Sequence, residues 1–315
     1  MVLLAVANGL LLFILLRNGI GRPSAYAFLA FFVLNPYFAL NLCRATGEAA
    51  VLFFSTLAIY CAVKALIAVQ EMNSASPIEM VSIWGWLIGM AAVTGLAGAS
   101  KLNGLMIATA VILVVIAVGF EFPRSVTRES RISFMLKAIV LLLLMIGLTF
   151  IIINPYLYPN PIYRTALMIK FRNYEMTMQQ VLYPESIIAN ASRLSILFSR
   201  LFQDFTFLNF HSGWLVNCFL FGIGLYVLIR SAYRWLKGRS GDATAGGILF
   251  VLLTMVVPSL FTPLDWERYY LFPVLFICLC TSVGFGSFVK IFVSHGKHFR
   301  EMLRKAGIKV GRKSQ

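Results

Sequence analysis

The sequence predicts an all-α, polytopic membrane protein built as a bundle of about nine transmembrane helices. Hydrophobic residues fill 60% of its 315 positions, and only 12% of the residues are charged, about half the charged share of an average soluble domain. Mean hydropathy is correspondingly high, at +0.84. In addition, apolar runs near ~20 residues long, the length of helix that crosses a bilayer, recur along nearly the whole chain.

Nine apolar segments are expected to form the membrane-spanning helices. They are residues 2–16, 25–43, 49–69, 81–99, 104–120, 138–153, 213–229, 245–261 and 269–292. The second segment is broken at Asn35 and Pro36, because proline removes a backbone donor and disfavours a helix before it. We expect one transmembrane domain over residues 1–293, followed by a basic tail over residues 294–315.

The longest interruption of this pattern is residues 154–211. Prolines at three positions between Asn154 and Pro161 prevent the preceding helix from continuing. Basic and aromatic residues then alternate, and a second amphipathic piece, residues 186–210, contains Arg193 and Arg200. A loop of this length between spans is expected to be functional and to carry interfacial helices. Its composition suits contact with lipid headgroups, sugars or phosphates.

The distribution of charge predicts the topology. The formal net charge is +15, and 19 of the 27 basic residues fall on one side, in residues 17–22, 64, 124–137, 230–239, 290 and the tail. The positive-inside rule places this side, with the C-terminus, in the cytoplasm. The loop 154–211 and three short links, residues 44–48, 100–103 and 262–268, are then extracytoplasmic. We therefore expect a multi-pass protein of the cell membrane whose functional face is extracytoplasmic.

Other partners and sites are not favoured by the composition. Basic loops beside membrane lipids explain the positive charge, and no stacking platform or basic helix indicates binding to nucleic acid. All of the cysteines lie in apolar runs, where they are expected to be small buried residues without a disulfide or a metal site. They are Cys43, Cys61, Cys218, Cys278 and Cys280.

Two of the short outer links contain charges beside apolar spans. Arg44 and Glu48 are four positions apart, which fits either an interfacial ion pair at the start of a helix or an acid held at the mouth of a membrane cavity. Lys101 lies between two long apolar runs. A lysine there either extends its amine to the interface or binds an anion.

The third link has the highest density of charged and aromatic residues. Residues 263–270 contain Asp265, Glu267 and Arg268 beside three aromatic residues. One interpretation is an aromatic belt with paired charges at the membrane interface. The interpretation that we favour is a rim that holds a sugar by stacking and hydrogen bonds while Arg268 meets a phosphate.

Several of these motifs, taken in order, resemble the multispan glycosyltransferases of the GT-C fold. The motifs are Leu-Asn-Pro-Tyr-Phe at 34–38, Cys-Arg-Ala-Thr-Gly-Glu at 43–48, Phe-Phe-Ser-Thr-Leu-Ala at 53–58, the lysine-bearing turn at 95–104, the proline-rich run at 154–161, and Glu-Arg-Tyr-Tyr-Leu-Phe-Pro at 267–273. The chain is most similar to the protein O-mannosyltransferase and aminoarabinose transferase branch. Each motif is short, and the resemblance rests on their order over most of the chain and on their shared predicted face.

The resemblance implies an enzyme that moves a sugar from a polyprenyl-phosphate carrier to a lipid, glycan or protein acceptor, with inversion at the sugar. Glu48 is then the candidate catalytic residue, which orients the acceptor or a base. Positive charge beside the leaving phosphate would stabilise the charge that develops there. The candidate substrate-binding residues are Arg44, Lys101, Asn103, Arg164, Arg172, Asp265, Glu267, Arg268 and Tyr269. No cofactor follows from the residues themselves, and the resemblance leaves a divalent metal open for the complete enzyme.

The sequence also departs from this family. The family's principal catalytic carboxylate lies in the first outer loop, whereas the first acidic residue here is Glu48, which matches the family's second acidic position. The charge topology also places Met1 outside without a segment to bring it there. We therefore expect the natural protein to have a preceding helix and acidic loop, and this chain alone to show little transfer. The alternatives are a multispan transporter and a non-catalytic accessory subunit; internal repeats, which would favour the transporter, are not found.

Overall fold

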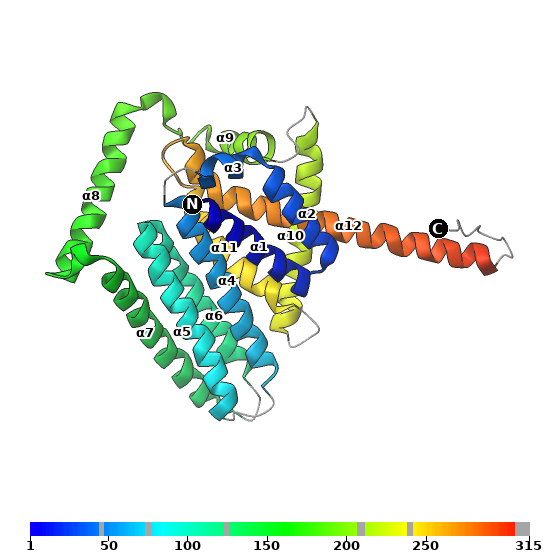
Figure 1. The fold of residues 1–315 in the computed structure, drawn as a ribbon, viewed down its shortest axis with the longest axis horizontal. Helices are drawn as coiled ribbons and strands as arrows, with labels where there is room; N and C mark the ends of the chain where they lie inside the picture. Colours follow the sequence, from blue (N-terminus) through cyan, green and yellow to red (C-terminus); the bar gives the residue numbers. More distant parts are fainter. Residues whose placement is uncertain (44–46, 73–76, 123–125, 207–211, 238–241, 306–315) are drawn as a thin grey trace.

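The structure, a computed structural model, describes residues 1–43, 47–72, 77–122, 126–206, 212–237 and 242–305. Within these residues the chain forms helices and connecting turns, and the only β-type pairing described is an isolated bridge between Ile187 and Leu264. The all-α prediction is therefore confirmed (Figure 1).

The helices follow the predicted apolar segments in order. They are α1 (Val2–Gly19), α2 (Arg22–Leu34), α3 (Pro36–Cys43), α4 (Glu48–Gln70), α5 (Pro77–Ser100), α6 (Ile107–Glu121), α7 (Arg128–Ile153), α8 (Pro161–Leu182), α9 (Arg193–Ser199), α10 (Gly213–Leu236), α11 (Ala243–Ser259) and α12 (Leu271–Lys305). Short helical turns join some of them. They are η1 (Leu102–Met106), η2 (Pro155–Leu157), η3 (Pro184–Ser186), η4 (Arg200–Asp204) and η5 (Glu267–Tyr270).

The length and apolar character of these helices indicate a multi-span membrane protein. Among the described residues, 7 helices are long and apolar enough to cross a membrane, and the count reaches 8 if the bent pair α2–α3 forms one span. α11 is apolar but shorter, at 17 residues. The predicted count of nine therefore stays a prediction.

The break at Asn35 and Pro36 bends α2 and α3 by 65°. Pro36 has no backbone N–H to donate. The Asn35 side chain satisfies the new helix end instead, because its Oδ1 accepts the N–H of Tyr37 at 3.0 Å. The bend directs α3 toward the start of α4, which contributes to the candidate site below.

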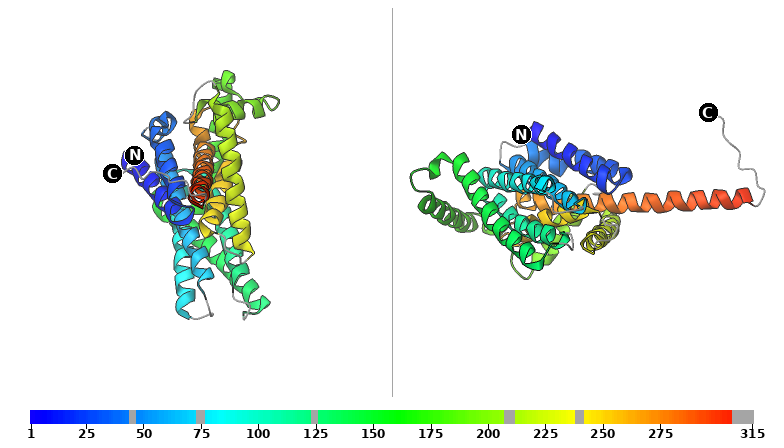
Figure 2. Two further views of the ribbon diagram at one scale, coloured as in Figure 1. Left: turned by 90° about the vertical axis from the view of Figure 1, so that its right-hand side faces the viewer. Right: turned by 90° about the horizontal axis from the view of Figure 1, so that it is seen from below.

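Two predicted boundaries differ from the structure by ten residues or more. α7 begins at Arg128, before the predicted start at residue 138, because Thr127 caps it by accepting the N–H of Ser130 at 3.2 Å and Glu129 favours the first turn. α12 continues to Lys305 into the predicted tail, so residue 294 is not a helix end. Figure 2 shows the C-terminal part of α12 extending beyond the other helices.

The packed body of the protein centres on α4, which contacts α1, α5, α6 and α11. α10 crosses α12 very closely where Gly224 faces Gly284. A Cβ atom at Gly224 would overlap the carbonyl oxygen of Cys280, and one at Gly284 would overlap that of Leu220. Small residues at such crossings let two helix backbones approach and pack closely. Further along α12, Lys290 Nζ donates to the carbonyl oxygen of Ile20 at 2.8 Å.

Candidate functional site

A cavity of about 840 Å³ lies where several helix ends meet. Its walls come from the start of α4, the end of α5 with η1, the end of α11, the start of α12 and the middle of α8. The residues that carry its chemistry are Glu48, Ser100, Lys101, Asn103, Arg172, Asn173, Arg268 and Tyr269. The structure thus brings residues from the three short links and from the long loop to one cavity.

The centre of one wall is an ion pair between Lys101 and Glu48. Lys101 Nζ lies 2.7 Å from Glu48 Oε1, and the side chains are 27% and 6% exposed. Glu48 is the first residue of α4, where the helix dipole favours a negative charge. Lys101 follows α5 in an extended conformation, which points the chain out of the helix axis before η1 begins.

The two links approach each other closely enough to fix this pair. A Cβ atom added at Gly47 would lie 2.9 Å from the carbonyl oxygen of Ser100, so glycine permits the contact. The N–H of Lys101 still bonds to Ala97 O at 3.0 Å, and the N–H of Gly104 bonds to Lys101 O at 2.8 Å. The backbone that carries Lys101 is therefore hydrogen-bonded on both sides.

The rim of the cavity is an aromatic stack with a cation. The rings of Trp266 and Tyr269 stack at 12° with centroids 5.8 Å apart. The guanidinium of Arg268 lies 4.6 Å from the Trp266 ring centroid and 5.4 Å from that of Tyr269. Within the described residues no carboxylate forms an ion pair with Arg268. The rim therefore presents an aromatic surface and a positive charge that no described carboxylate neutralises.

α8 contributes the opposite wall through Ile169, Arg172, Asn173 and Met176. Their spacing places them on one face of the helix. Arg172 Nη1 pairs with Glu175 Oε2 at 3.1 Å, and the Tyr269 hydroxyl contacts Met176 Sδ at 3.6 Å. No residue of α8 is buried, so this wall is held mainly through the turns at its two ends.

Arg200 fastens the rest of the long loop to the rim. Its Nη2 donates to Asp265 Oδ2 at 2.8 Å and its Nε to Asp265 Oδ1 at 3.1 Å, while Nη1 reaches Asp204 at 2.9 Å. Asp265 Oδ1 also accepts the Tyr270 hydroxyl at 2.9 Å. Arg193 adds a second attachment, since its Nη1 donates to the carbonyl oxygens of Leu260 and Thr262 at 3.3 and 2.8 Å. We call the pair of Arg200 with Asp265 the loop clamp.

The loop clamp shifts the pKa of both partners in the direction that keeps them charged. Burial by itself raises the pKa of Asp265, but the hydrogen bonds from Arg200 and Tyr270 outweigh it, so the pKa lies below its ordinary value. The hydrogen bond to Asp265 raises the pKa of Arg200. Both groups are therefore ionised at neutral pH, and the attachment of the loop depends on this charge.

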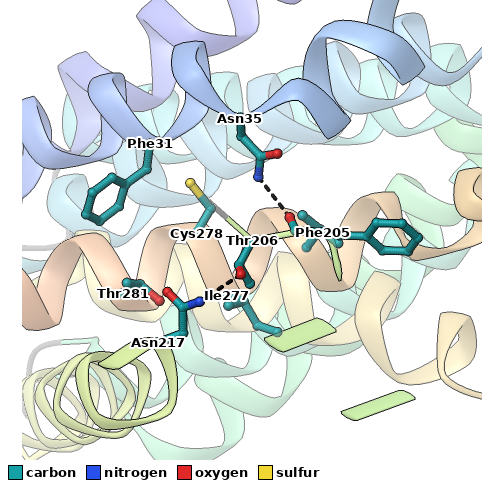
Figure 3. A pocket seen from close by; sticks show the side chains of 9 residues that line it. Phe31, Asn35, Phe205, Thr206, Asn217, Ile277, Cys278 and Thr281 are labelled. Carbon is teal, nitrogen blue, oxygen red and sulfur yellow. Dashed lines mark hydrogen bonds between the residues drawn. The ribbon is translucent and has the colours of Figure 1, made fainter. Parts of the chain in front are cut away.

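A small polar cluster holds the end of the loop (Figure 3). Asn35 Nδ2 donates to Phe205 O at 2.8 Å, and Asn217 Nδ2 donates to Thr206 Oγ1 at 2.7 Å. They lie around a cavity of about 20 Å³ between α2, α10 and α12, with Thr281 on the α12 side. The break in the α2–α3 pair thus secures the loop as well as turning the chain.

The structure gathers some of the predicted substrate-site residues and separates others. Glu48, Lys101, Asn103, Arg172, Arg268 and Tyr269 line the cavity. The other described residues do not line this cavity, and their role in substrate binding stays a prediction. The guanidinium of Arg164 stacks over Tyr156 at 4.8 Å and donates to its carbonyl oxygen. Asp265 belongs to the loop clamp, and the exposed Glu267 accepts the Tyr37 hydroxyl through its backbone oxygen at 2.6 Å. Arg44 lies outside the described residues.

Sequence reasoning gave no role to Ser100 or Asn173, which also line the cavity, and did not foresee the loop clamp. The one available signal for the clamp was a pair of arginines in the amphipathic piece 186–210 opposite acids in residues 262–268. Among the described residues no group of three or more His, Cys, Asp or Glu side chains is placed to hold a metal. The described part of the site therefore does not fit a resident metal ion.

No protein-family model matches the chain, and no curated protein or solved structure matches it significantly.

Proposed function

We propose that the protein is an integral membrane glycosyltransferase that takes a sugar from a polyprenyl-phosphate carrier. One observation carries the proposal. A single cavity at the ends of several apolar helices combines a buried carboxylate, a lysine, an arginine without a described carboxylate partner, and the ring of Tyr269, which stacks on Trp266 at the rim. These are the groups needed to bind a phosphate and a sugar next to an acceptor.

The balance of charge favours an anionic ligand. In the described lining, Glu48 is paired with Lys101, and Arg172 is paired with Glu175. No described carboxylate pairs with Arg268. A phosphate placed near Arg268 and Lys101 would therefore gain charge-assisted hydrogen bonds from both. The aromatic face beside Arg268 provides a stacking surface for a sugar ring.

The lining also suits a ligand with a long apolar part. Val51, Met106, Ile169, Phe261 and Phe272 share the cavity with the polar groups above. The cavity volume of about 840 Å³ lies in the range of roughly 300–1,000 Å³ that is usual for ligand sites. A sugar phosphate with the first isoprene units of its carrier fits this combination of polar and apolar walls.

The reaction is written as a displacement at the anomeric carbon. The acceptor hydroxyl oxygen forms a bond to that carbon as the carbon–oxygen bond to the carrier phosphate breaks, and the phosphate leaves with the electron pair. Lys101 and Arg268 stabilise the negative charge that develops on the phosphate. Glu48, held by Lys101, accepts a hydrogen bond from the acceptor hydroxyl and orients it. As the new bond forms, the hydroxyl proton passes to the leaving phosphate, which departs as a dianion and takes up this proton. Because the described residues do not fit a metal, no step is assigned to one.

The position of the cavity favours this function over a transporter. Substrate sites of secondary transporters lie near the bilayer midplane between broken helices. Here the lining residues that belong to the long apolar helices come from the ends of these helices, with Glu48 starting α4 and Ser100 ending α5. An accessory subunit without activity would share the fold but would not need the phosphate-binding charges.

The experiment compares lipid binding with and without the phosphate. In nanodiscs, the protein should bind a polyprenyl phosphate more tightly than the corresponding polyprenol. Lys101→Met or Arg268→Leu should each lower the affinity for the phosphate roughly ten- to a hundredfold, as expected for a lost charged hydrogen bond. Affinity for the polyprenol should stay unchanged. Transfer from a polyprenyl-phosphate sugar to added acceptors is then measured directly.

Arg164→Leu is the matched control, because it removes a cation of the same predicted extracytoplasmic face that does not line the cavity. It should leave phosphate-lipid binding unchanged. Equal affinity for phosphate and alcohol, or an equal loss in the Arg164 variant, would contradict the proposal. Uptake of a soluble substrate into proteoliposomes, abolished by the Lys101 variant, would favour the transporter instead.

A further inference from the structure

We infer that α8 lies in the interface of a membrane that contains anionic lipid, with one face in the acyl-chain region and the opposite face on the cavity. The inference concerns α8 as a lipid-binding surface and does not depend on the proposed function. α8 is not among the candidate spans, and its 22 residues include none that is buried. Something outside the described residues must cover its apolar side chains, or they remain in water.

Six apolar side chains form a continuous stripe along α8. They are Tyr163, Leu167, Phe171, Tyr174, Met178 and Val181, with exposures from 36% for Met178 to 67% for Val181. Steps of three and four residues place them on one side of the helix. We call this set the outer stripe. The residues that line the cavity, including Arg172 and Met176, project from the other side.

The position of α8 in the chain indicates that lipid covers the outer stripe. α7 is a candidate span, and only 22% of its most apolar stretch is buried. Leu144, Leu148 and Ile152 are among its exposed residues, so its outward face is a lipid-facing surface. Tyr156 and Tyr158, both exposed, follow directly at the position of an interfacial aromatic belt. The chain then turns into α8, which stands at the edge of the molecule (Figure 1). The outer stripe therefore continues the lipid-facing surface of α7.

The charges beside the stripe indicate the type of headgroup. Arg164 and Lys170 flank it, and in the described residues neither forms an ion pair with a carboxylate. Arg172 is neutralised by Glu175 on the cavity side. A helix with an apolar face bordered by cations is the form that lies in the plane of an anionic interface. Because the same helix walls the cavity, the bilayer surface itself lies directly behind that wall.

The inference is tested by the depth of spin labels in nanodiscs of phosphatidylglycerol. Cys43→Ser and Cys218→Ser remove the two cysteines that are not buried. Labels are then placed singly at Leu167→Cys and Val181→Cys in the outer stripe, and at Asn173→Cys on the cavity side. Molecular oxygen should speed the spin relaxation of the labels at positions 167 and 181 more than a water-soluble nickel complex does. At position 173 the nickel complex should have the larger effect. Raising the salt from about 0.1 M to 1 M, which shortens the Debye length from roughly 10 Å to 3 Å, should move the outer labels toward water.

Three results would overturn the inference. Outer labels that are accessible to nickel would place the stripe in water. Labels protected from both reagents, with dipolar coupling between molecules, would show that a second copy covers the stripe. If the outer labels lie at the same depth in phosphatidylcholine nanodiscs, and if this depth does not change with salt, anionic headgroups do not hold α8 at the membrane.

The wild-type chain gives a second measurement that needs no cysteine substitution. Phosphatidylglycerol with a photoreactive group in its acyl chain should form adducts on α8 at the outer stripe and not at the cavity-lining residues Ile169, Arg172, Asn173 and Met176. Adducts confined to other helices would also contradict the inference.

Discussion

The wall of the cavity formed by α4 and α5 is packed into the bundle, whereas the wall formed by α8 meets the protein mainly at its two ends. Glu48 is 6% exposed and is fixed to Lys101 across two closely approaching links. Arg172, on α8, forms its ion pair within its own helix and is 36% exposed. The same cavity therefore has one wall in which the charges are held rigidly and one wall that depends on its surroundings.

This difference separates two tasks of a binding site. Fixed charges stabilise a ligand or transition state without reorganisation when they are held by packing and hydrogen bonds. A wall with few buried contacts opens at little cost in free energy, because local stability follows buried apolar contact. The packed wall is thus suited to chemistry, and α8 is suited to admitting a large ligand.

The largest expected effect comes from the α10–α12 crossing in the packed region. Gly224→Ala should lower the free energy of unfolding by about 3 kcal/mol, the upper part of the usual range for overpacking, because the new Cβ overlaps the Cys280 carbonyl oxygen. Thermal unfolding in detergent measures this. Gly222→Ala is the control on the same helix, where a new Cβ meets nothing within 4 Å. Equal effects of the two changes would show that α10 and α12 do not pack so closely.

The fold was largely predictable because the membrane imposes a strong pattern on sequence. Apolar runs, the proline at position 36 and the distribution of basic residues placed most helices and collected the cavity-lining links on one predicted side. The misplaced start of α7 has a local cause. The charges at Arg128 and Arg131 suggested a loop, but they occupy a capped helix end, since charged residues are compatible with helix outside the apolar core of the membrane.

The site was only partly predictable, because pairing of charges depends on geometry that short motifs do not encode. Arg268 and Asp265 lie in one short link, yet Arg268 lines the cavity and Asp265 turns to Arg200. The partner of Asp265 is 65 positions away, and no local pattern selects Arg200 over Arg193. Likewise, the interpretation of Glu48 as half of a salt bridge with Arg44 did not identify Lys101 as a partner, which only the approach of Gly47 to Ser100 brings near.

The next effect tests the fixed ion pair by a double-mutant cycle. Glu48→Gln, Lys101→Met and the double variant should give a coupling energy on the order of 1.5–3 kcal/mol, the contribution of a hydrogen bond between charged groups. Unfolding is followed in detergent for all four proteins. The pair of Arg172 with Glu175, measured in the same way, should give less than about 0.5 kcal/mol, because both side chains are more than a third exposed. A coupling in the first cycle as small as in the second would contradict the contrast between the two walls.

A smaller effect is expected for the loop clamp as the pH falls. The folded pKa of Asp265 is depressed, so its stabilising contribution is complete above the unfolded pKa and is lost as the pH falls through the folded pKa. Because Arg200 is 38% exposed, the contribution is discounted for solvent screening to about 0.5–1 kcal/mol. Between pH 5 and pH 2, hydrogen exchange in residues 184–204 should therefore accelerate relative to the packed helices. Asp265→Asn should show the faster exchange already at neutral pH and lose most of the acid dependence. Unchanged exchange in that variant would mean that Arg193 and the backbone bonds attach the loop without the clamp.

The smallest effect concerns the one described side-chain contact between the rim and the middle of α8. Tyr269→Phe removes the hydroxyl that meets Met176 Sδ at 3.6 Å while retaining the ring that stacks on Trp266. A contact to a thioether is weak, so global stability should change by less than about 0.5 kcal/mol, within the usual range for surface substitutions. If α8 is held chiefly at its ends, its amide exchange should also stay close to that of the wild type. Met176→Leu, which keeps the side-chain size and removes the acceptor, should reproduce this result. Much faster amide exchange of α8 in either variant would show that this contact supports the whole wall. The difference in stability between the two walls of the cavity would then be much smaller than the burial of their residues indicates.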